Sequence, residues 1–539
     1  MIQSYKKKYT LEDSYDVLMI GSGMGCLSAA SILAKEGKKV LILERHYTAG
    51  GFTHVFKRRG YEWDVGIHYI GEVQRKNSPI RILFDYITNS KLEWADMGRV
   101  YDRIIIGNKS YDFIKGVENF KNKIYQYFPS EKEAIDKYIN LVFASSKSMG
   151  KFYASKVFPK FIDKILGGFM KKEYLKYSNQ TTYDVISSLT KNEDLIKLLT
   201  AQYGDYGLTP KKSSFAMHAS VVKHYLGGGS FPIGGSSKIL DTIYPVIQKA
   251  SGTILVSAEV KNIIIKKNVA IGVKMNDGKE IYAKTIISGT GIFNTYKKLI
   301  PSDISKKYEF ESRLNKVKPS VAHGCLYIGL NGSSKELKLP KSNLWIYPDK
   351  GDHDKCVNDY LDNFNAPFPL VYISFPSSKD PSWDDRYPGK STIDIITLLP
   401  FELFSKWKST KWMKRGNDYE KLKETISKRL LEHLYKHLPH LRGKIDHYEL
   451  STPLSTKNFV NYKKGELYGI DHDPNRFNQS FLKPRTELKN FFLTGQDIVT
   501  AGVGGALFAG LITASAVTGK NLLKKIRSTS KITNTTDNK

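Results

Sequence analysis

Blocks of apolar residues separated by polar turns predict a first unit of strand, turn, helix and strand. The apolar run Tyr15–Ile20 leads into the turn Gly21-Ser22-Gly23, and a helical stretch follows. The next apolar strand, Val40–Leu43, ends on Glu44. This order is typical of an α/β fold built on a parallel sheet.

A second group of short elements predicts the remainder of that sheet. We expect a helix at 237–250 and strands at 253–256, 260–265, 270–275 and 285–288. The turn Asn276-Asp277-Gly278 lies between two β-rich runs, which indicates a hairpin. The pattern therefore predicts a parallel sheet continued by a β-meander.

Two long insertions interrupt this unit. The first, about 86–226, is rich in helical periodicity, and the second, about 301–445, mixes strand-like runs with a long helix at 418–437. The end of the chain is rich in Ser, Thr, Asn and Lys, which favours disorder. We predict an N-terminal extension (1–14), a discontinuous α/β domain (15–85, 227–300 and 446–525), a helical insertion (86–226), an α+β substrate lobe (301–445) and a disordered tail (526–539).

One helix of the first insertion is amphipathic. At helical spacing its apolar face carries Phe158, Phe161, Ile162, Ile165, Leu166 and Phe169. Its other face carries Lys156, Lys160 and Lys164. A basic helix with an aromatic apolar face is typical of a membrane interface, although a helix that covers a protein core has the same periodicity. We expect this helix to contact a membrane surface.

The uncharged segment 498–519 has the length of a membrane span. Small residues recur in it at every fourth position, at Gly502, Ala506, Gly510 and Ala514. Such a face packs closely on another backbone, so we predict an internal helix and no transmembrane helix.

The glycine turn has the chemistry of a dinucleotide site. Gly21 and Gly23 allow a tight turn and a close approach of the backbone to a pyrophosphate, whose charge the helix N-terminus would meet. Glu44 lies where a carboxylate would bind an adenosine ribose. Cys26 stands at the third glycine position of the pattern, and a glycine turn without a ligand is the plain structural alternative.

Further along, the chain resembles the superfamily of FAD-dependent phytoene desaturases, carotenoid isomerases and retinol saturases. The similarity rests on Glu44-Arg45, the pair Gly50-Gly51, the segment 61–71 and the closing segments 491–497 and 501–510. The desaturases and isomerases usually carry a His-Pro-Gly or Phe-Pro-Gly signature near the end. This chain has Thr494-Gly495-Gln496-Asp497 instead, which looks most like the retinol saturases.

The resemblance implies a Rossmann-type FAD-binding domain of three layers with FAD as the cofactor. It assigns the following cofactor-binding residues: Gly21, Gly23, Gly25, Glu44, Arg45, Gly50, Gly51, Val260, Gly495, Asp497, Gly502 and Val503. Glycine runs elsewhere lack a strand–helix frame, so no second dinucleotide site is visible. We therefore expect a separate electron donor.

The resemblance also implies saturation of a C=C bond in retinol or a related isoprenoid polyene, with hydride delivered by reduced flavin. His68 and Tyr69 lie in the segment that returns past the flavin, and they are our candidate proton donors. A structural role for both residues is the alternative. The histidines show no ligand spacing, so no metal is expected.

Composition adds the setting. The formal net charge is +30, from 83 basic and 53 acidic residues, which favours an anionic membrane surface as a partner. The lysines are scattered without a nucleic-acid motif, so nucleic acid is not expected. Three cysteines without CxxC spacing argue against a disulfide framework, and no secretory signal is apparent. We expect a cytoplasmic protein that associates peripherally with membranes.

Three kinds of function remain open at this point. One alternative to a saturase is a carotenoid or phytoene desaturase, or a carotenoid isomerase, because all three share one site. An alternative of another class is a flavin-binding redox sensor or scaffold without turnover. The mass of the product would separate the enzymes, and a flavin that no substrate reoxidises would indicate the scaffold.

Overall fold

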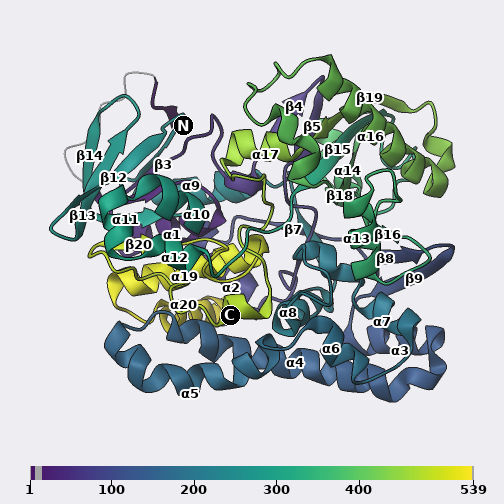
Figure 1. Ribbon diagram of the computed structural model, residues 1–539, viewed down its shortest axis with the longest axis horizontal. Coiled ribbons are helices and arrows are strands. Elements are labelled where there is room, and N and C mark those ends of the chain that lie inside the picture. The colour runs from purple at the N-terminus through teal and green to yellow at the C-terminus, as the bar shows by residue number, and fades with distance from the viewer. Residues whose placement is uncertain (1, 7–14, 537–539) are drawn as a thin grey trace.

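The computed structural model describes residues 2–6 and 15–536. Two large β-sheets form the framework of the fold (Figure 1). The first sheet has the order β1-β11-β3-β2-β14-β13-β12, with β20 paired to β14. Its strands are β1 (Gln3–Ser4), β2 (Tyr15–Ile20), β3 (Val40–Leu43), β11 (Thr253–Val256), β12 (Val260–Lys266), β13 (Val269–Met275), β14 (Glu280–Ser288) and β20 (Phe491–Leu493). Strands β1, β11, β3, β2, β14 and β20 pair in parallel, and β12, β13 and β14 form an antiparallel meander. The predicted α/β fold with its meander is confirmed.

Helices from distant parts of the chain pack on this sheet or on the helices that cover it. They are α1 (Met24–Lys35), α2 (Pro79–Thr88), α9 (Lys238–Lys249), α19 (Gly502–Thr518) and α20 (Leu522–Thr536). Helices α1 and α19 lie so close that a Cβ on Gly510 would come within 2.5 Å of the Ser28 Cβ. The predicted internal position of this small-residue helix is therefore correct. Among the described residues no single helix is long and apolar enough to cross a membrane, and only the bent pair of α19 with the first part of α20 passes that test together.

The second sheet has the order β19-β15-β18-β17-β16-β8-β9. Its strands are β8 (Val100–Ile106), β9 (Lys109–Ile114), β15 (His323–Asn331), β16 (Asn343–Tyr347), β17 (Val371–Ser374), β18 (Lys390–Leu398) and β19 (Ile445–Ser451). Helix α16 (Asn417–His437) packs against β17 and β19. Two predicted boundaries are wrong here: β8 and β9 come from the helical insertion, and β19 extends beyond the predicted end of the substrate lobe. Backbone pairing decides both cases, since β8 pairs with β16 and β19 with β15.

Short elements connect the two sheets. The strands are β4 (Val55–Arg58), β5 (Tyr61–Asp64), β6 (Ile70–Gly71), β7 (Trp94–Asp96) and β10 (Gly229–Pro232). The helices are α10 (Ile292–Asn294), α11 (Ser302–Lys307), α12 (Phe310–Leu314), α13 (His353–Asp362), α14 (Pro376–Lys379), α15 (Trp383–Arg386), α17 (Pro453–Val460) and α18 (Pro474–Phe477). Strands β4 and β5 pair with each other, and β6, β10 and β7 form a three-stranded sheet.

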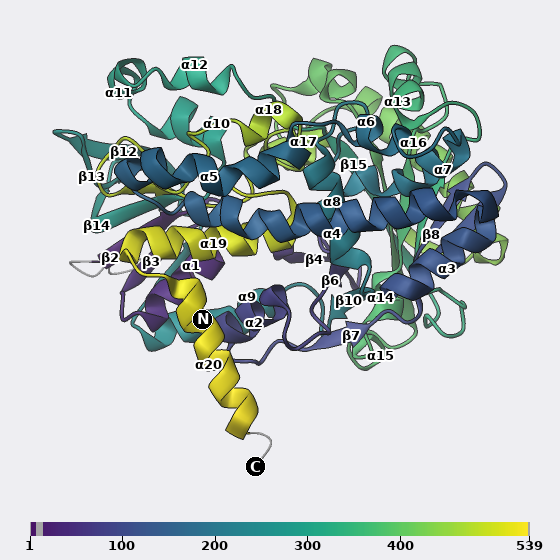
Figure 2. The ribbon, with the colours of Figure 1, turned by 90° about the horizontal axis from the view of Figure 1, so that it is seen from below.

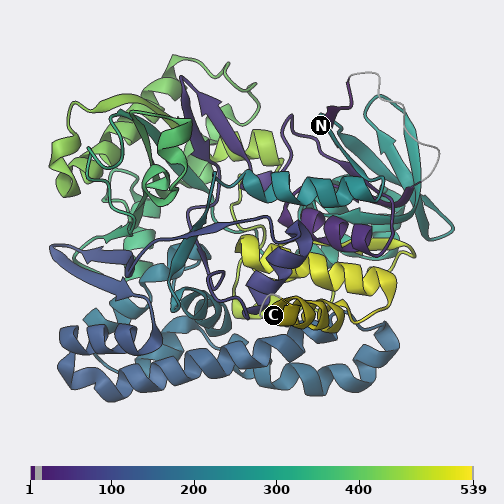
Figure 3. The ribbon, with the colours of Figure 1, turned by 180° about the vertical axis from the view of Figure 1, so that it is seen from behind.

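A layer of helices runs beneath both lobes (Figures 1 and 3). It consists of α3 (Val117–Tyr127), α4 (Lys132–Ser155), α5 (Lys160–Ser178), α6 (Thr182–Ser187), α7 (Glu193–Leu199) and α8 (Phe215–Tyr225). Helices α4 and α5 lie side by side across this layer (Figure 2). Tyr174 of α5 is buried against Phe152 and Phe477. The apolar face of α5 is exposed, with exposed fractions of 76% for Phe161, 64% for Ile165 and 79% for Phe169, so this face does not cover a core.

Both ends of the chain carry more structure than the sequence predicts. The N-terminal extension contributes β1, which pairs with β11 at the sheet edge, while residues 7–14 lie outside the described residues. The predicted disordered tail is wrong up to Thr536, because α20 continues through it, and residues 537–539 lie outside the described part. Leu522 and Ile526 are buried against the core, and Lys520 and Lys525 pair with Glu36, which explains why a polar segment folds here.

Candidate functional site

The glycine turn opens directly onto the N-terminus of α1. Gly21 has φ +95°, and Gly23 caps the helix without a side-chain hydrogen bond. The first N–H groups of α1 are therefore not capped by a side chain, and a Cβ on Gly23 would meet nothing within 4 Å. Glu44 at the end of β3 holds the turn, since its Oε2 accepts hydrogen bonds from Ser22 N (2.8 Å) and Ser22 Oγ (2.7 Å). An uncapped helix end behind open space is the arrangement that binds an anion such as a pyrophosphate.

The missing third glycine has a structural explanation. Cys26 is buried. A Cβ on Gly289, the residue directly after β14, would lie 2.3 Å from the Cys26 Sγ, so the absence of a side chain at Gly289 makes room for the Cys26 side chain. Gly25 faces the closing loop, where its Cβ would come within 2.7 Å of the Gly495 Cα and N. Helix α1 and the sheet therefore still pack closely, because the glycine is at position 289 beside the sheet and not at position 26 on the helix.

The Gly50-Gly51 pair lies against the same turn. Gly50 (φ +119°) donates its N–H to Ser22 Oγ at 2.9 Å, and a Cβ on Gly51 (φ +58°) would lie 2.9 Å from the Gly23 Cα. Arg45 points elsewhere, because its guanidinium donates to the carbonyls of Asn458 (2.6 Å) and Phe459 at the end of α17. These hydrogen bonds attach the Arg45 side chain to the C-terminal end of α17.

The predicted adenine contact, Val260, begins β12 and is buried. Two residues earlier, Ala258 donates its N–H to the Glu44 carbonyl at 2.8 Å. The start of β12 therefore lies beside the acid that ends β3.

Asp497 fixes the closing loop from within. Its Oδ2 accepts the Ile292 N–H at 2.8 Å and its Oδ1 accepts the Ile470 N–H at 3.2 Å, and burial raises the pKa of this carboxyl. The buried guanidinium of Arg476 binds the loop from the other side. It donates to the carbonyls of Ile470, Asp471, Gln496, Asp497 and Val499. The sequence did not single out Arg476, whose role depends on contacts distant along the chain.

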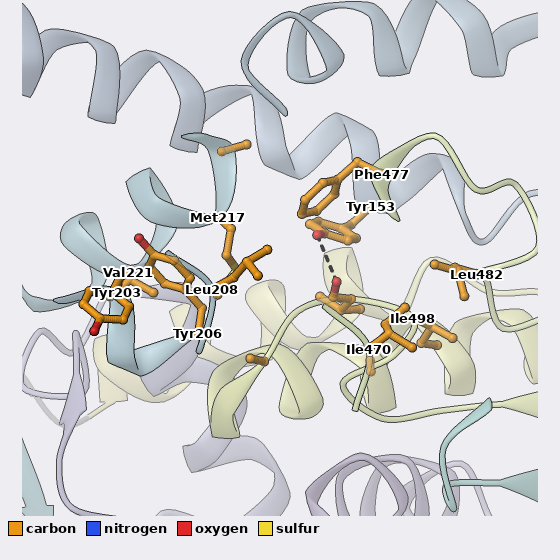
Figure 4. Packing of buried hydrophobic residues seen from close by; sticks show 14 of the residues in the cluster. Tyr153, Tyr203, Tyr206, Leu208, Met217, Val221, Ile470, Phe477, Leu482 and Ile498 are labelled. Atoms are coloured by element: carbon orange, nitrogen blue, oxygen red, sulfur yellow. Dashed lines mark hydrogen bonds between the residues drawn. The ribbon is translucent and has the colours of Figure 1, made fainter. Parts of the chain in front are cut away.

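A cavity of about 1260 Å³ lies between the two lobes and the helical layer. Gly502 and Val503, at the N-terminus of α19, form part of its wall, as do His68 and Tyr69. Phe158 and Ile162 line it from the α4–α5 side. Figure 4 shows the packing beside it, where Tyr153 of α4 donates a hydrogen bond to the Val499 carbonyl at 3.2 Å. The wall is mostly apolar, so it fits a long hydrophobic molecule.

His68 is buried between the cavity and the second sheet. Its Nδ1 lies 3.4 Å from Asp394 Oδ2, and its carbonyl accepts a hydrogen bond from Lys379 Nζ at 2.9 Å. Burial lowers the pKa of His68 to about 3 and raises the pKa of Asp394 well above its usual range. His68 is therefore a neutral imidazole at neutral pH, because desolvation disfavours the imidazolium.

Tyr69 is stacked on Tyr225, with ring centroids 4.0 Å apart. Its Oη lies 3.0 Å from Asp102 Oδ2 and 3.1 Å from Asp205 Oδ2, and burial raises the pKa of the phenol well above its usual range. The sequence missed both carboxylates and Asp394. Asp394 could have been noticed in the sequence, because it is a single acidic residue within the apolar run of β18. Asp102 and Asp205 are brought close together only by the tertiary fold.

The structure thus brings together Gly21, Gly23, Gly25, Glu44, Gly50, Gly51 and Gly495 at one turn, and places His68, Tyr69, Gly502 and Val503 on the cavity. The Rossmann-like turn defines a dinucleotide-binding domain, and the same molecule holds a large apolar cavity. In agreement, residues 19–87 match the family model of the NAD(P)-binding Rossmann-like domain.

Curated relatives specify the family. The chain is 35% identical to the all-trans-retinol 13,14-reductase of Homo sapiens over 96% of its own length and 87% of that protein. It is 25% identical to prolycopene isomerase 2 of an Oncidium hybrid cultivar over 85% of its own length and 75% of that protein. The chain belongs to the all-trans-retinol 13,14-reductase family.

Solved structures agree on the fold alone. Putrescine oxidase superposes with a TM-score of 0.61 at 13% sequence identity, covering 94% of this chain and 99% of that one.

Proposed function

We propose that this protein uses FAD to saturate a C=C bond of retinol or a related isoprenoid polyene. The observation that carries the proposal is full-length similarity to retinol 13,14-reductases, combined with an apolar cavity of about 1260 Å³. Pockets for small molecules usually have volumes of about 300–1000 Å³. A larger cavity has room for a flavin ring and an extended polyene.

The residues at the turn fit FAD. The open space at Gly23 and the uncapped N-terminus of α1 would receive the pyrophosphate, with Glu44 beside the ribose and the start of β12 near the adenine. Gly502 and Val503 would meet the flavin end, where the N-terminus of α19 favours negative charge. Bound FAD would supply hydride chemistry.

The chain's own side chains would orient the substrate and supply the proton. We propose that His68 and Tyr69 contact the reacting part of the polyene, His68 as a neutral imidazole. The mostly apolar walls would limit the access of water to a bound reduced flavin. No second dinucleotide site is proposed, so electrons would come from a separate reductase or carrier.

An anaerobic absorption experiment tests the function. The purified protein is reduced with dithionite, and all-trans-retinol is then added. Reoxidation of the flavin together with a product heavier by two hydrogens supports the saturase. A desaturase would leave the reduced flavin unchanged, but in the oxidised protein the polyene would reduce the flavin and give a product lighter by two hydrogens. An isomerase would give a product of unchanged mass while the flavin stays reduced. Flavin that stays reduced with every polyene, with no product formed in either redox state, would favour a scaffold or sensor, and a protein that takes up no FAD would refute the proposal.

We further propose that α5 rests on an anionic membrane surface, from which the substrate enters. Phe161, Ile165 and Phe169 are exposed on one face, while Phe158 and Ile162 at the same end line the cavity. Exposed apolar faces of this kind are unusual on monomeric proteins and mark interaction sites. The net charge of +30 adds attraction to anionic lipid.

A further inference from the structure

Tyr69 lies between two carboxyl groups, the fully buried Asp102 and the partly buried Asp205. Its Oη is within hydrogen-bond distance of Asp102 Oδ2 (3.0 Å) and Asp205 Oδ2 (3.1 Å). A phenol has one proton and can donate to only one of these oxygens. The second contact is a hydrogen bond only if the other carboxyl carries a proton and donates it to the Tyr69 oxygen.

The surrounding donors decide which carboxyl is protonated. Burial raises the pKa of Asp102, but Asp102 also accepts hydrogen bonds from Gln202 Nε2 (3.0 Å) and Asn343 Nδ2 (2.9 Å), which oppose that shift and favour its ionised form over that of Asp205. For Asp205, the side-chain hydrogen bond found among the described residues is the one with Tyr69. Burial raises the pKa of Asp205 well above its usual range, and the neighbouring Asp102 charge raises it further. Asp205 is therefore the neutral acid.

Asp205 is also the member of the pair that lines the cavity. Six tyrosines from the surrounding elements lie close enough for an ionised Asp205 to act on them electrostatically. They are Tyr69, Tyr206, Tyr225, Tyr347, Tyr372 and Tyr468. Lys379 lies on the far side of Asn343, to whose Oδ1 it donates, and its charge acts on Asp102. A neutral carboxylic acid therefore faces a mostly apolar cavity.

We propose that Asp205 donates the proton that completes saturation of the substrate double bond. The inference rests on the proposed function, in which two electrons reach one carbon as a hydride from the reduced flavin. As that C–H bond forms and the π bond breaks, the neighbouring carbon takes the proton of Asp205, which becomes a carboxylate. Tyr69 then turns its proton from Asp102 to Asp205, while Gln202 and Asn343 continue to hold Asp102. Solvent reprotonates Asp205 between turnovers.

The test compares Asp205→Asn with the wild type in anaerobic reoxidation of the reduced flavin by all-trans-retinol. Asparagine keeps the size of the side chain but has no acidic proton. We expect the rate to fall about 100- to 10 000-fold, the usual contribution of a general acid, with KM little changed. The wild-type rate should decrease as pH rises through the pKa of Asp205, since the protonated form is active, and this limb should vanish in the variant.

Two comparisons complete the experiment. Asp112→Asn, which breaks a partly exposed ion pair with Arg103 on the neighbouring strand, should leave the rate unchanged. Asp205→Glu should restore part of the rate. The infrared absorption of protonated carboxylic acids at pH 7 should be weaker by one group in Asp205→Asn than in the wild type, while Asp394 contributes equally in both, and this readout does not depend on turnover.

The outcomes separate the two proposals. If wild-type flavin is not reoxidised by retinol, the proposed function fails, whatever Asp205 does. If the wild type turns over and Asp205→Asn matches it in rate and pH profile, the proton-donor assignment alone is overturned. A variant that raises KM with an unchanged kcat would make Asp205 a binding residue for the substrate hydroxyl, and it would overturn the assignment equally.

Discussion

Gly23→Ala separates the stability of the glycine turn from its ability to hold a dinucleotide. Gly23 has φ −64° and ψ 168°, which alanine adopts without strain, and its Cβ would meet nothing within 4 Å. Replacing glycine at a compatible position stabilises a protein by about 0.4–1 kcal/mol through the unfolded state. The FAD-free variant should therefore be at least as stable as the wild type.

Binding of FAD should respond in the opposite direction. If the pyrophosphate approaches the backbone at Gly23, the added methyl group displaces it and removes at least one charge-assisted hydrogen bond. Such a bond contributes about 1.5–3 kcal/mol, so the Kd for FAD should rise roughly 10- to 150-fold. Titration of the FAD-free protein with FAD by flavin fluorescence measures the affinity, and thermal unfolding without FAD measures the stability.

Gly25→Ala is the matched comparison two residues along the chain. Its Cβ would lie 2.7 Å from two backbone atoms of Gly495, so α1 and the closing loop must separate. Overpacking of this kind costs about 1–3 kcal/mol, and this variant should lose stability even without FAD. Unaltered FAD affinity in Gly23→Ala would refute the placement of the pyrophosphate at this turn.

Three further perturbations follow from the structure. Replacing Phe161 and Phe169 with serine should weaken binding to anionic vesicles by roughly 30- to 1000-fold, from about 1–2 kcal/mol for each of the two buried rings. Met413→Ser, at an exposed site elsewhere, should leave vesicle binding unchanged. Equal vesicle binding by both variants in flotation would show that α5 does not contact the membrane. Burial raises the pKa of Asp64 from 3.8 to about 6, so the folded state keeps a proton that the unfolded state releases; this contribution is present below about pH 4 and lost as pH rises through 6. Urea unfolding at pH 4 and 7 should show the wild type losing about 2 kcal/mol more than Asp64→Asn, and parallel pH profiles would contradict this. Arg476→Gln should cost about 3 kcal/mol or more in the same assay and reduce FAD retention, because several buried carbonyls lose their donor; retention at the wild-type level would show that the closing loop holds without the guanidinium.

The alternation of apolar runs and glycine turns was sufficient to predict the local elements of the first sheet. Strands β2, β3 and β11 have the predicted bounds, and the hairpin at Asn276-Asp277-Gly278 joins β13 to β14 as expected. Local propensity and turn chemistry decide these features, so they are visible in a window of a few residues. The cofactor residues near Gly21 and Gly50 belong to the same class, because a tight turn requires glycine wherever the fold appears.

Pairing between segments that are distant in the sequence could not be predicted from a window of a few residues. Strands β8 and β9 belong to the second sheet only because β16, more than 200 residues later, hydrogen-bonds to β8. Helix α20 forms in a polar segment because Lys520 and Lys525 pair with Glu36 and the apolar side of the helix packs against the core. In both cases long-range contacts outweigh local composition.

The sequence by itself determined the α/β class, the dinucleotide turn, the family and the segment that bears His68 and Tyr69. Only the tertiary structure decided the protonation of that site. A histidine has an ordinary pKa until burial removes its water, and an aspartate is an ordinary surface acid until a second carboxylate is folded against it. The neutral state of His68 and of Asp205 depends on desolvation and on charges contributed by distant segments. Neither the desolvation nor these charges can be predicted from the residues adjacent in the sequence.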